Sequence, residues 1–270
     1  MKHHHTLRRT LIGALAAAPL VNALPLRAQT PSPAMPHVTL VLTGSVRAAL
    51  AATSTIPIVT ITVARPVEQG FAVSLARPGK NVTGNVLIEG VTDEKSVEII
   101  HEFVPRGTRI AFLDDPANPV DGRTQRFGAA AARLKLTPIF VAASSLEEVP
   151  PAFASAVKQR AQMLVVASSA VFSANPKITV NLAARHRLPA VYPNDAYVAD
   201  GALVTYGYSN AVMARNAVLI ADRILKGRKP AELPFEQPTH FEMVVNRTTA
   251  KTLGLTIPQT ILVRADRVIE

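Results

Sequence analysis

From residue 38 onward, short apolar runs alternate with stretches in which apolar residues recur every three or four positions. Runs of the first kind, such as VTLVLTG at 38–44, are typical of buried parallel strands. Stretches of the second kind, such as AVMARNAVLIADRILKG at 211–227, are typical of helices packed on one face. The alternation predicts an α/β protein whose parallel sheets are flanked by helices.

The pattern assigns a range to each expected element. Strands are expected at 38–44, 56–64, 82–88, 109–115, 138–143, 162–169, 190–193 and 241–246, and a further strand is expected to end at 206–207. Helices are expected at 45–53, 67–76, 93–103, 122–136, 178–187, 211–227 and 247–254. A further helix, ending near residue 161, is expected to start at Ser145 and Glu148, which have capping-box spacing.

The first 28 residues differ from the rest of the chain. They combine a basic start, an apolar run broken by Pro19 and Pro25, and small residues at the exit. This order is typical of a secretory signal peptide, and the run is too short and broken for a membrane span. We therefore expect residues 1–28 to be a cleaved leader and the mature protein to lie in the periplasm. Arg8 and Arg9 leave open whether export is general or twin-arginine.

Composition excludes several classes of function. The chain has no Cys, which excludes disulfides, thiol nucleophiles, Cys-ligated metals and a lipoprotein anchor. The formal net charge is +10, but the bases outside the leader are scattered, and only 5% of residues are aromatic. Nucleic-acid binding would need a basic stripe or stacking rings, so no nucleic-acid partner is expected.

Three long motifs carry a family resemblance. They are SLARPGKNVTG at 74–84, ADRILKGRKPAELPFEQPTHFEMVVN at 221–246, and TAKTLGLTIP at 249–258. With them the chain resembles, from about Val38 to Glu270, substrate-binding proteins of ABC transporters, in the branch that includes tryptophan and tyrosine binders. The resemblance implies a two-lobed type I periplasmic-binding fold, a small-molecule ligand such as an amino acid or small carboxylate held in the cleft between lobes, and an inner-membrane ABC permease as partner. It implies neither enzymatic activity nor a cofactor.

The resemblance also implies how the chain divides. The first lobe is expected to comprise residues 37–88 and about 206–238, and the second 89–205 and about 239–270. Family members usually carry two further strands before the one at 38–44, so the first lobe resembles a truncated version. The strand at 38–44 would then be an uncharged sheet edge, and we expect the mature protein to form a homodimer or to aggregate through it.

Ligands of open α/β sheets bind beyond the carboxyl ends of the strands. The polar, small or aromatic residues that follow the expected strands are therefore the candidate ligand-binding residues, although each such loop could equally be an ordinary turn. They are Thr43, Ser45, Arg65, Asn118, Ser169, Phe172, Asp195 and Tyr206.

Two candidates depart from the family pattern. Relatives commonly have Asp where this chain has Arg65 and Ser169, so both changes remove acid from the expected site. We therefore expect an anionic ligand group with Arg65 as its bidentate partner. The alternative is that Arg65 points to solvent in a decayed site.

No pattern indicates catalysis or metal binding. The histidines outside the leader lack metal-ligand spacing, and there is no G-x-S-x-G elbow, P-loop or dinucleotide fingerprint. No catalytic residue, metal or cofactor is expected. Three alternatives to a transport receptor remain: a ligand-sensing module, a binding-defective remnant of such a receptor, and, least supported, an enzyme on the same fold.

Overall fold

The computed structural model describes residues 37–41, 45–87, 90 and 92–270. These described residues fall into two compact units: those up to Val86 with Asn216–Glu236 (unit 1), and those from Leu87 to Arg215 with Gln237–Glu270 (unit 2). The predicted signal peptide, Thr43 and part of the expected lobe boundary near residue 88 lie outside the described residues.

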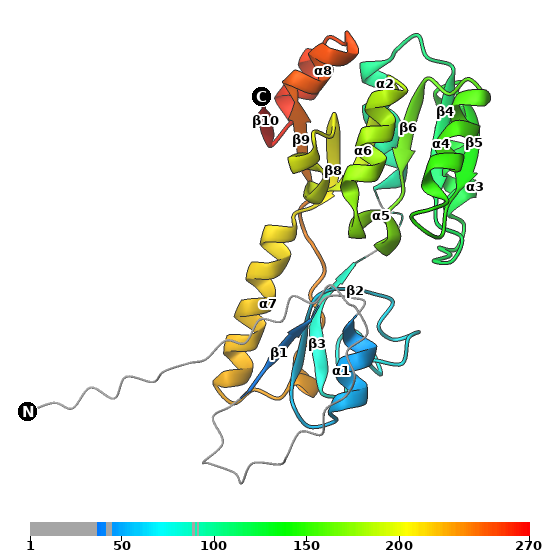
Figure 1. Cartoon of the computed structure of the whole chain (residues 1–270). Coiled ribbons are helices and arrows are strands. Elements are labelled where there is room, and N and C mark those ends of the chain that lie inside the picture. Colours follow the sequence, from blue (N-terminus) through cyan, green and yellow to red (C-terminus); the bar gives the residue numbers. More distant parts are fainter. Residues whose placement is uncertain (1–36, 42–44, 88–89, 91) are drawn as a thin grey trace, which may run out of the picture. The chain divides into compact units, whose positions relative to one another are not determined.

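Unit 1 contains a parallel three-stranded sheet of order β1-β2-β3 (Figure 1). The strands are β1 (Thr39–Val41), β2 (Ile58–Ala64) and β3 (Val82–Leu87), and the helices are α1 (Val46–Ala52), the C-terminal part of α7 (Asn210–Leu225) and the 3-10 turn η3 (Pro230–Glu232). One apolar cluster joins Val46 of α1 to the sheet, and a second joins Ala217 and Ile220 of α7 to Val59 of β2. The sheet is therefore covered on both faces.

The two edges of this sheet differ. The outer edge of β3 is paired, because Glu236 N donates to the carbonyl of Gly84 at 2.9 Å and Val86 N donates to the carbonyl of Glu236 at 2.9 Å. β1 pairs with β2 in parallel and is the terminal strand among the described residues. It carries no charged side chain, so the expected uncharged edge is present in this part of the chain.

Unit 2 contains a seven-stranded sheet of order β10-β9-β8-β7-β6-β4-β5. Its strands are β4 (Arg109–Asp114), β5 (Thr137–Ala142), β6 (Met163–Val166), β7 (Ala190–Asn194), β8 (Val204–Tyr208), β9 (Glu242–Asn246) and β10 (Arg267–Ile269). The β8–β9 pair is antiparallel and the other pairs are parallel. Consequently β4, β6, β7 and β8 end at the same edge, which we call the carboxyl edge of unit 2.

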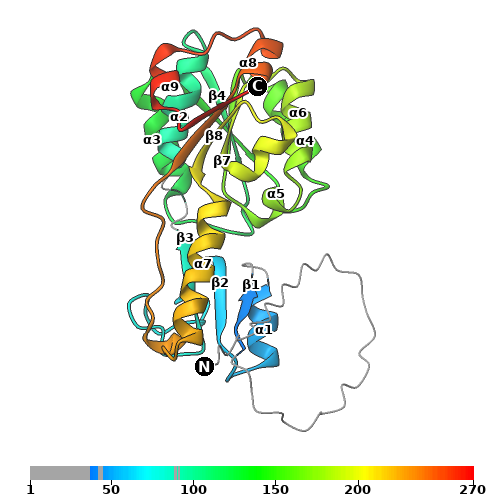
Figure 2. The ribbon, with the colours of Figure 1, turned by 90° about the vertical axis from the view of Figure 1, so that its left-hand side faces the viewer.

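Helices cover both faces of this sheet (Figure 2). The helices are α2 (Asp93–Phe103), α3 (Arg123–Arg133), α4 (Val149–Lys158), α5 (Ala170–Ala174), α6 (Pro176–Arg185), the 3-10 helix η2 (Asp195–Asp200), α8 (Arg247–Leu253) and α9 (Gln259–Arg264). One core is formed with α2, α3, α8 and α9, and the other with α4, α5, α6 and η2. Buried apolar side chains on both faces explain why the strands read as continuous apolar runs.

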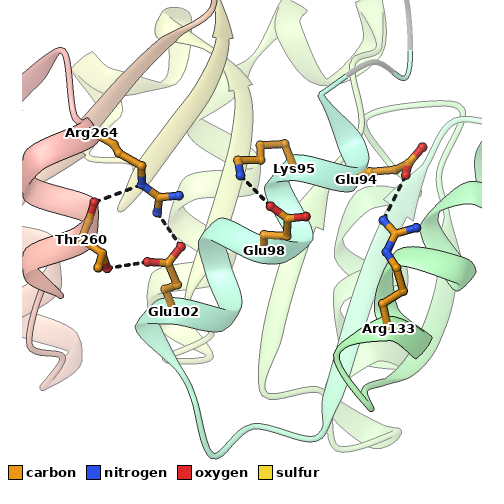
Figure 3. Close-up of polar contacts among 7 residues, drawn as sticks. All are labelled: Glu94, Lys95, Glu98, Glu102, Arg133, Thr260 and Arg264. Carbon is orange, nitrogen blue, oxygen red and sulfur yellow. Dashed lines mark hydrogen bonds and ion pairs between the residues drawn. The ribbon is translucent and has the colours of Figure 1, made fainter.

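The exposed face of α2 ties this layer together through charged side chains (Figure 3). Glu94 pairs with Arg133 of α3 at 3.2 Å, and Glu102 accepts hydrogen bonds from Thr260 and Arg264 of α9. These pairs are partly exposed, so each adds at most about 1 kcal/mol to stability. Their main effect is to fix where α9 sits on α2.

The expected α/β architecture is confirmed, but one expected helix is wrong. Residues 67–76 form successive turns instead of a helix. Gly70 has φ +72°, and the N–H groups of Phe71 and Ala72 both donate to the carbonyl of Pro66, which closes a loop. The apolar pattern there reflects the insertion of Phe71 into the core of unit 1.

Other differences are local. The expected capping box does not form: Glu148 is the residue before α4, and its carboxylate accepts the N–H of Ser144 at 2.7 Å. The strand expected at 162–169 ends at Val166, which places Ser169 at the start of α5. The elements α5, η2, η3, α9 and β10 were not expected from the sequence.

Candidate functional site

The carboxyl edge of unit 2 gathers carboxylate, hydroxyl and amide side chains in two hydrogen-bonded groups. The first follows β4 and β6. Ser169 donates to Asp115 Oδ2 at 2.7 Å, and Asp115 Oδ1 accepts the N–H of Ala117 at 3.0 Å. Ser169 also accepts the N–H of Val171 and so caps α5. Asp115 is 3% exposed and Ser169 is 4% exposed, so this group forms the buried floor of the edge.

The second group follows β7 and β8. Asp195 Oδ1 accepts from the backbone N–H and the side-chain amide of Asn210, at 3.0 and 2.8 Å, and its Oδ2 accepts from Ser209 at 3.0 Å. The side-chain amide of Asn194 donates to the Tyr208 hydroxyl at 3.1 Å. Asp195 is partly exposed. One carboxylate therefore fixes the start of α7 and remains partly exposed.

Close backbone contact fixes the spacing of β7 and β8 at this edge. A Cβ on Gly207 would lie 1.7 Å from the carbonyl oxygen of Pro193, a separation that no side chain can occupy. The register between the strands also shifts between Tyr192 and Asn194. Only glycine at 207 lets β8 approach closely enough to bring Tyr208 against Asn194.

A buried ion cluster lies beneath the first group. Arg123, at the start of α3, pairs with Asp93 of α2 and Asp114 of β4, each at 3.0 Å, and its guanidinium donates to the carbonyl of Ser168 at 3.4 Å. Burial raises the pKa of Asp93, although the positive charge of Arg123 opposes this effect. The cluster holds the residues before Asp115 and before Ser169 in place.

The structure divides the predicted residues of unit 2 into those at the polar edge and those packed in the core. Asn118 and Ser169 come together around Asp115, since Asn118 N donates to its carbonyl at 3.0 Å, and Asp195 lies at the same edge. Phe172 is fully buried in the core with α4 and α6, and the ring of Tyr206 packs near Phe241, 6.1 Å between centroids, in the middle of β8. These two aromatic side chains therefore contribute to packing rather than to the polar edge.

The predicted residues of unit 1 have separate surroundings. Ser45 is exposed and precedes α1 without a side-chain capping bond, and Thr43 lies outside the described residues. Arg65 follows β2 with φ +45°, an unusual conformation for a residue with a side chain, and its Nε is 3.8 Å from Glu68. Whether Arg65 contacts a ligand or points to solvent in a decayed site stays a prediction.

Sequence reasoning missed several members of the edge. Asn194, Tyr208, Ser209 and Asn210 take part in the second group, and Asp93, Asp114 and Arg123 form the ion cluster. The polar pairs Asn194-Asp195 and Ser209-Asn210, each directly after an apolar run, were the available signal. No periodicity links Asp93 to Arg123, because their meeting depends on how α2 and α3 pack.

Metal binding and membrane insertion have no structural support in the described part of the chain. Among those residues, no three His, Cys, Asp or Glu side chains are grouped closely enough to hold a metal ion. No described helix has the length and apolar character needed to cross a membrane.

Comparison with known proteins decides the family. The model of the ABC transporter substrate binding protein family matches residues 38–269. The chain belongs to this family. Its members are binding proteins that take up a small-molecule ligand and interact with ABC permeases, and those of importers are typically extracytoplasmic.

Individual relatives agree with this assignment. A tyrosine-binding protein of Clostridioides difficile is 26% identical over 215 residues, which is 79% of this chain and 61% of that protein. The chain thus spans less than two thirds of this relative's length. The ABC domain from Streptococcus pneumonia solved in complex with L-Trp has a TM-score of 0.72 at 23% identity and covers 86% of this chain and 78% of its own.

A further solved structure, a conserved domain protein of Vibrio cholerae, has a TM-score of 0.69 at 26% identity and covers 86% of this chain and 77% of its own. Together these likenesses confirm the type I periplasmic-binding fold predicted from the sequence motifs.

Proposed function

We propose that this chain is the solute-binding component of an ABC importer and that it binds an amino acid through the carboxyl edge of unit 2. The proposal rests on Asp195, a partly exposed carboxylate held by three hydrogen bonds at the end of β7. A carboxylate has about four acceptor sites, so Asp195 retains capacity for an ammonium group. Relatives that bind tyrosine and tryptophan support an amino acid as the ligand.

The carboxylates at this edge change the expectation drawn from Arg65 and Ser169. Asp115 and Asp195 supply negative charge that the absence of acid at positions 65 and 169 does not remove. A zwitterion needs both signs, and an unpaired buried charge would be costly. We assign the ligand's ammonium group to Asp195. Arg65, in unit 1, keeps as a separate proposal the role of pairing with a carboxylate.

Calorimetric titration tests this assignment. L-tyrosine and L-tryptophan are compared with tyramine, which lacks the carboxylate, and with 3-(4-hydroxyphenyl)propionate, which lacks the ammonium group. Asp195→Asn should raise the Kd for L-tyrosine at least tenfold, since a charged hydrogen bond contributes about 1.5–3 kcal/mol. Asp195→Asn should leave the Kd for the propionate unchanged. Arg65→Ala should raise the Kd for the propionate and leave the Kd for tyramine unchanged.

Glu98→Gln is the matched control, because it removes one exposed carboxylate from α2 in unit 2. If Asp195→Asn and Glu98→Gln bind L-tyrosine equally well, Asp195 does not hold the ammonium group. If the wild-type protein binds neither amino acid at millimolar concentration, the proposal that this edge binds an aromatic amino acid is wrong.

The compartment and the assembly complete the proposal. We assign residues 1–28 as a cleaved signal peptide that delivers the protein to the periplasm, and cell fractionation with and without these residues tests it.

We also assign β1 as a homodimer edge, because its strand carries no charge. Leu40→Lys should convert a dimer into a monomer in light scattering, whereas Val73→Lys, on an exposed loop, should not.

A further inference from the structure

Unit 2 contains a cavity at the opposite end of β7 from Asp195. Its volume is about 240 Å³, and α6, η2 and α8 surround it. Ala190, the first residue of β7, and Leu203, which precedes β8, both line it. The carboxyl edge lies beyond Asn194 and Tyr208, at the other end of the same two strands. The cavity is therefore separate from the site assigned to Asp195.

The walls of the cavity are mostly apolar. Leu188, Leu203 and Leu253 line it, together with the ring of Tyr192. Tyr192 is 2% exposed, and the pKa of its phenol is raised by burial, so it presents a neutral hydroxyl. Cavities of about 150 Å³ with comparable walls hold a benzene ring. The space is large enough for a branched aliphatic side chain.

The same lining carries one cation and one anion. Arg187 lies between α6 and β7, and Asp200 is the last residue of η2. The guanidinium of Arg187 donates to the carbonyl of Thr252 at 3.4 Å, which uses one of its five N–H donors. Arg187 follows the end of α6 with φ +50°, and the N–H of Leu188 donates to the carbonyl of Ala183 at 2.9 Å, so this helix end fixes its backbone beside the cavity.

We propose that this cavity is a second ligand site, which binds an amino acid with an aliphatic side chain. The carboxylate of the ligand pairs with Arg187, because a guanidinium matches a carboxylate through two parallel hydrogen bonds. The ammonium group pairs with Asp200, and the side chain fills the apolar walls. A simple anion would gain Arg187 but meet the charge of Asp200, and a simple cation would have the opposite mismatch.

Titration of the mature protein with L-leucine tests the proposal. Arg187→Gln and Asp200→Asn should each raise the Kd for L-leucine at least tenfold. 4-Methylpentanoate and 3-methylbutylamine, which lack the ammonium and the carboxylate groups, should bind at least tenfold more weakly than L-leucine to the wild type. Asp195→Asn should leave L-leucine binding at this site unchanged, which separates it from the carboxyl edge.

A third variant tests the cavity without removing a charge. Ala184 is exposed on α6 and lines the cavity, so Ala184→Leu should block it and abolish the leucine site while keeping the helix. This variant decides the matter if the charge variants fail to fold. The proposal is overturned if the wild type takes up no L-leucine at millimolar concentration, or if Ala184→Leu binds it as the wild type does. Loss of binding in Asp195→Asn alone would likewise assign leucine to the carboxyl edge.

Discussion

Arg123 Nε lies 3.0 Å from Asp93 Oδ2, and the two side chains are only 1% and 5% exposed. The same guanidinium donates to Asp114 at 3.0 Å. Arg123 and Asp93 are thus enclosed beneath the carboxyl edge of unit 2, and Asp114 is 22% exposed. Removing the cation would leave Asp93 without a compensating charge in a medium that solvates it poorly.

Arg123→Met should therefore lower the free energy of unfolding by about 3–5 kcal/mol. Urea denaturation followed by circular dichroism measures the loss. Arg133→Met is the matched control, because Arg133 lies on the same helix but its side chain is 58% exposed in its pair with Glu94. It should cost less than about 1 kcal/mol. If both variants lose the same free energy of unfolding, the buried cluster contributes no more to stability than the exposed pair does.

Asp93 gives a prediction about pH. Burial raises its pKa above the ordinary value of 3.8, so the folded state favours the protonated carboxyl. The stability that this preference contributes is fully present below 3.8 and is lost as the pH rises through the folded-state pKa. Asn does not ionise, so Asp93→Asn does not lose stability in this way. The difference in unfolding free energy, variant minus wild type, should therefore increase as the pH rises from 3.8 through the folded-state pKa of Asp93.

Urea denaturation at a series of pH values measures this difference. Glu147 serves as the contrast, because hydrogen bonds from its own backbone N–H and from Ser145 lower its pKa. Its contribution is present above its unfolded-state pKa and is lost as the pH falls. A difference between Asp93→Asn and wild type that stays constant with pH would contradict the raised pKa.

Gly207 provides a prediction about strand spacing. Gly207→Ala should lower the free energy of unfolding by at least about 1–3 kcal/mol, because the added methyl meets the carbonyl of Pro193. It should also weaken amino-acid binding by displacing Tyr208 from Asn194. Gly128→Ala is the control: its Cβ would find only the ring of Phe140, at 4.0 Å, and it sits inside α3. That change should raise stability by up to about 1 kcal/mol.

Tyr192 and Tyr197 stack with centroids 4.9 Å apart in the core of unit 2. Burial raises the pKa of both phenols, so neither should ionise before the protein unfolds in alkali. Absorbance at alkaline pH should show a step that coincides with the loss of secondary structure. Tyr192→Phe should reduce that step by the absorbance of one phenolate, and a step that precedes unfolding would argue against burial of the pair.

The fold was largely predictable because most of its information is local. The apolar strand runs and the helix at 93–103 match the structure, since burial on both faces of a parallel sheet leaves a continuous apolar signature. The prediction of a helix at 67–76 was wrong because the apolar residues there insert into the core of unit 1 from a loop, and Gly70 allows the chain to turn. Pattern alone cannot distinguish an apolar loop that inserts from a helix that packs.

The site was less predictable because its parts come from distant segments. Strand ends identified Asn118, Ser169 and Asp195, which depend only on where a strand stops. They could not identify Arg123, which reaches Asp93 only after two helices have packed. Phe172 followed a strand as a ligand residue might, yet its side chain turned into the core.

The bond from the Thr83 hydroxyl to the carbonyl of Leu233, at 2.8 Å, spans 150 residues of sequence. The segment that completes the sheet of unit 1 is therefore synthesised only after most of unit 2. A nascent chain on the ribosome lacks this last piece until residue 236 has emerged, so unit 1 stays unfinished through most of translation.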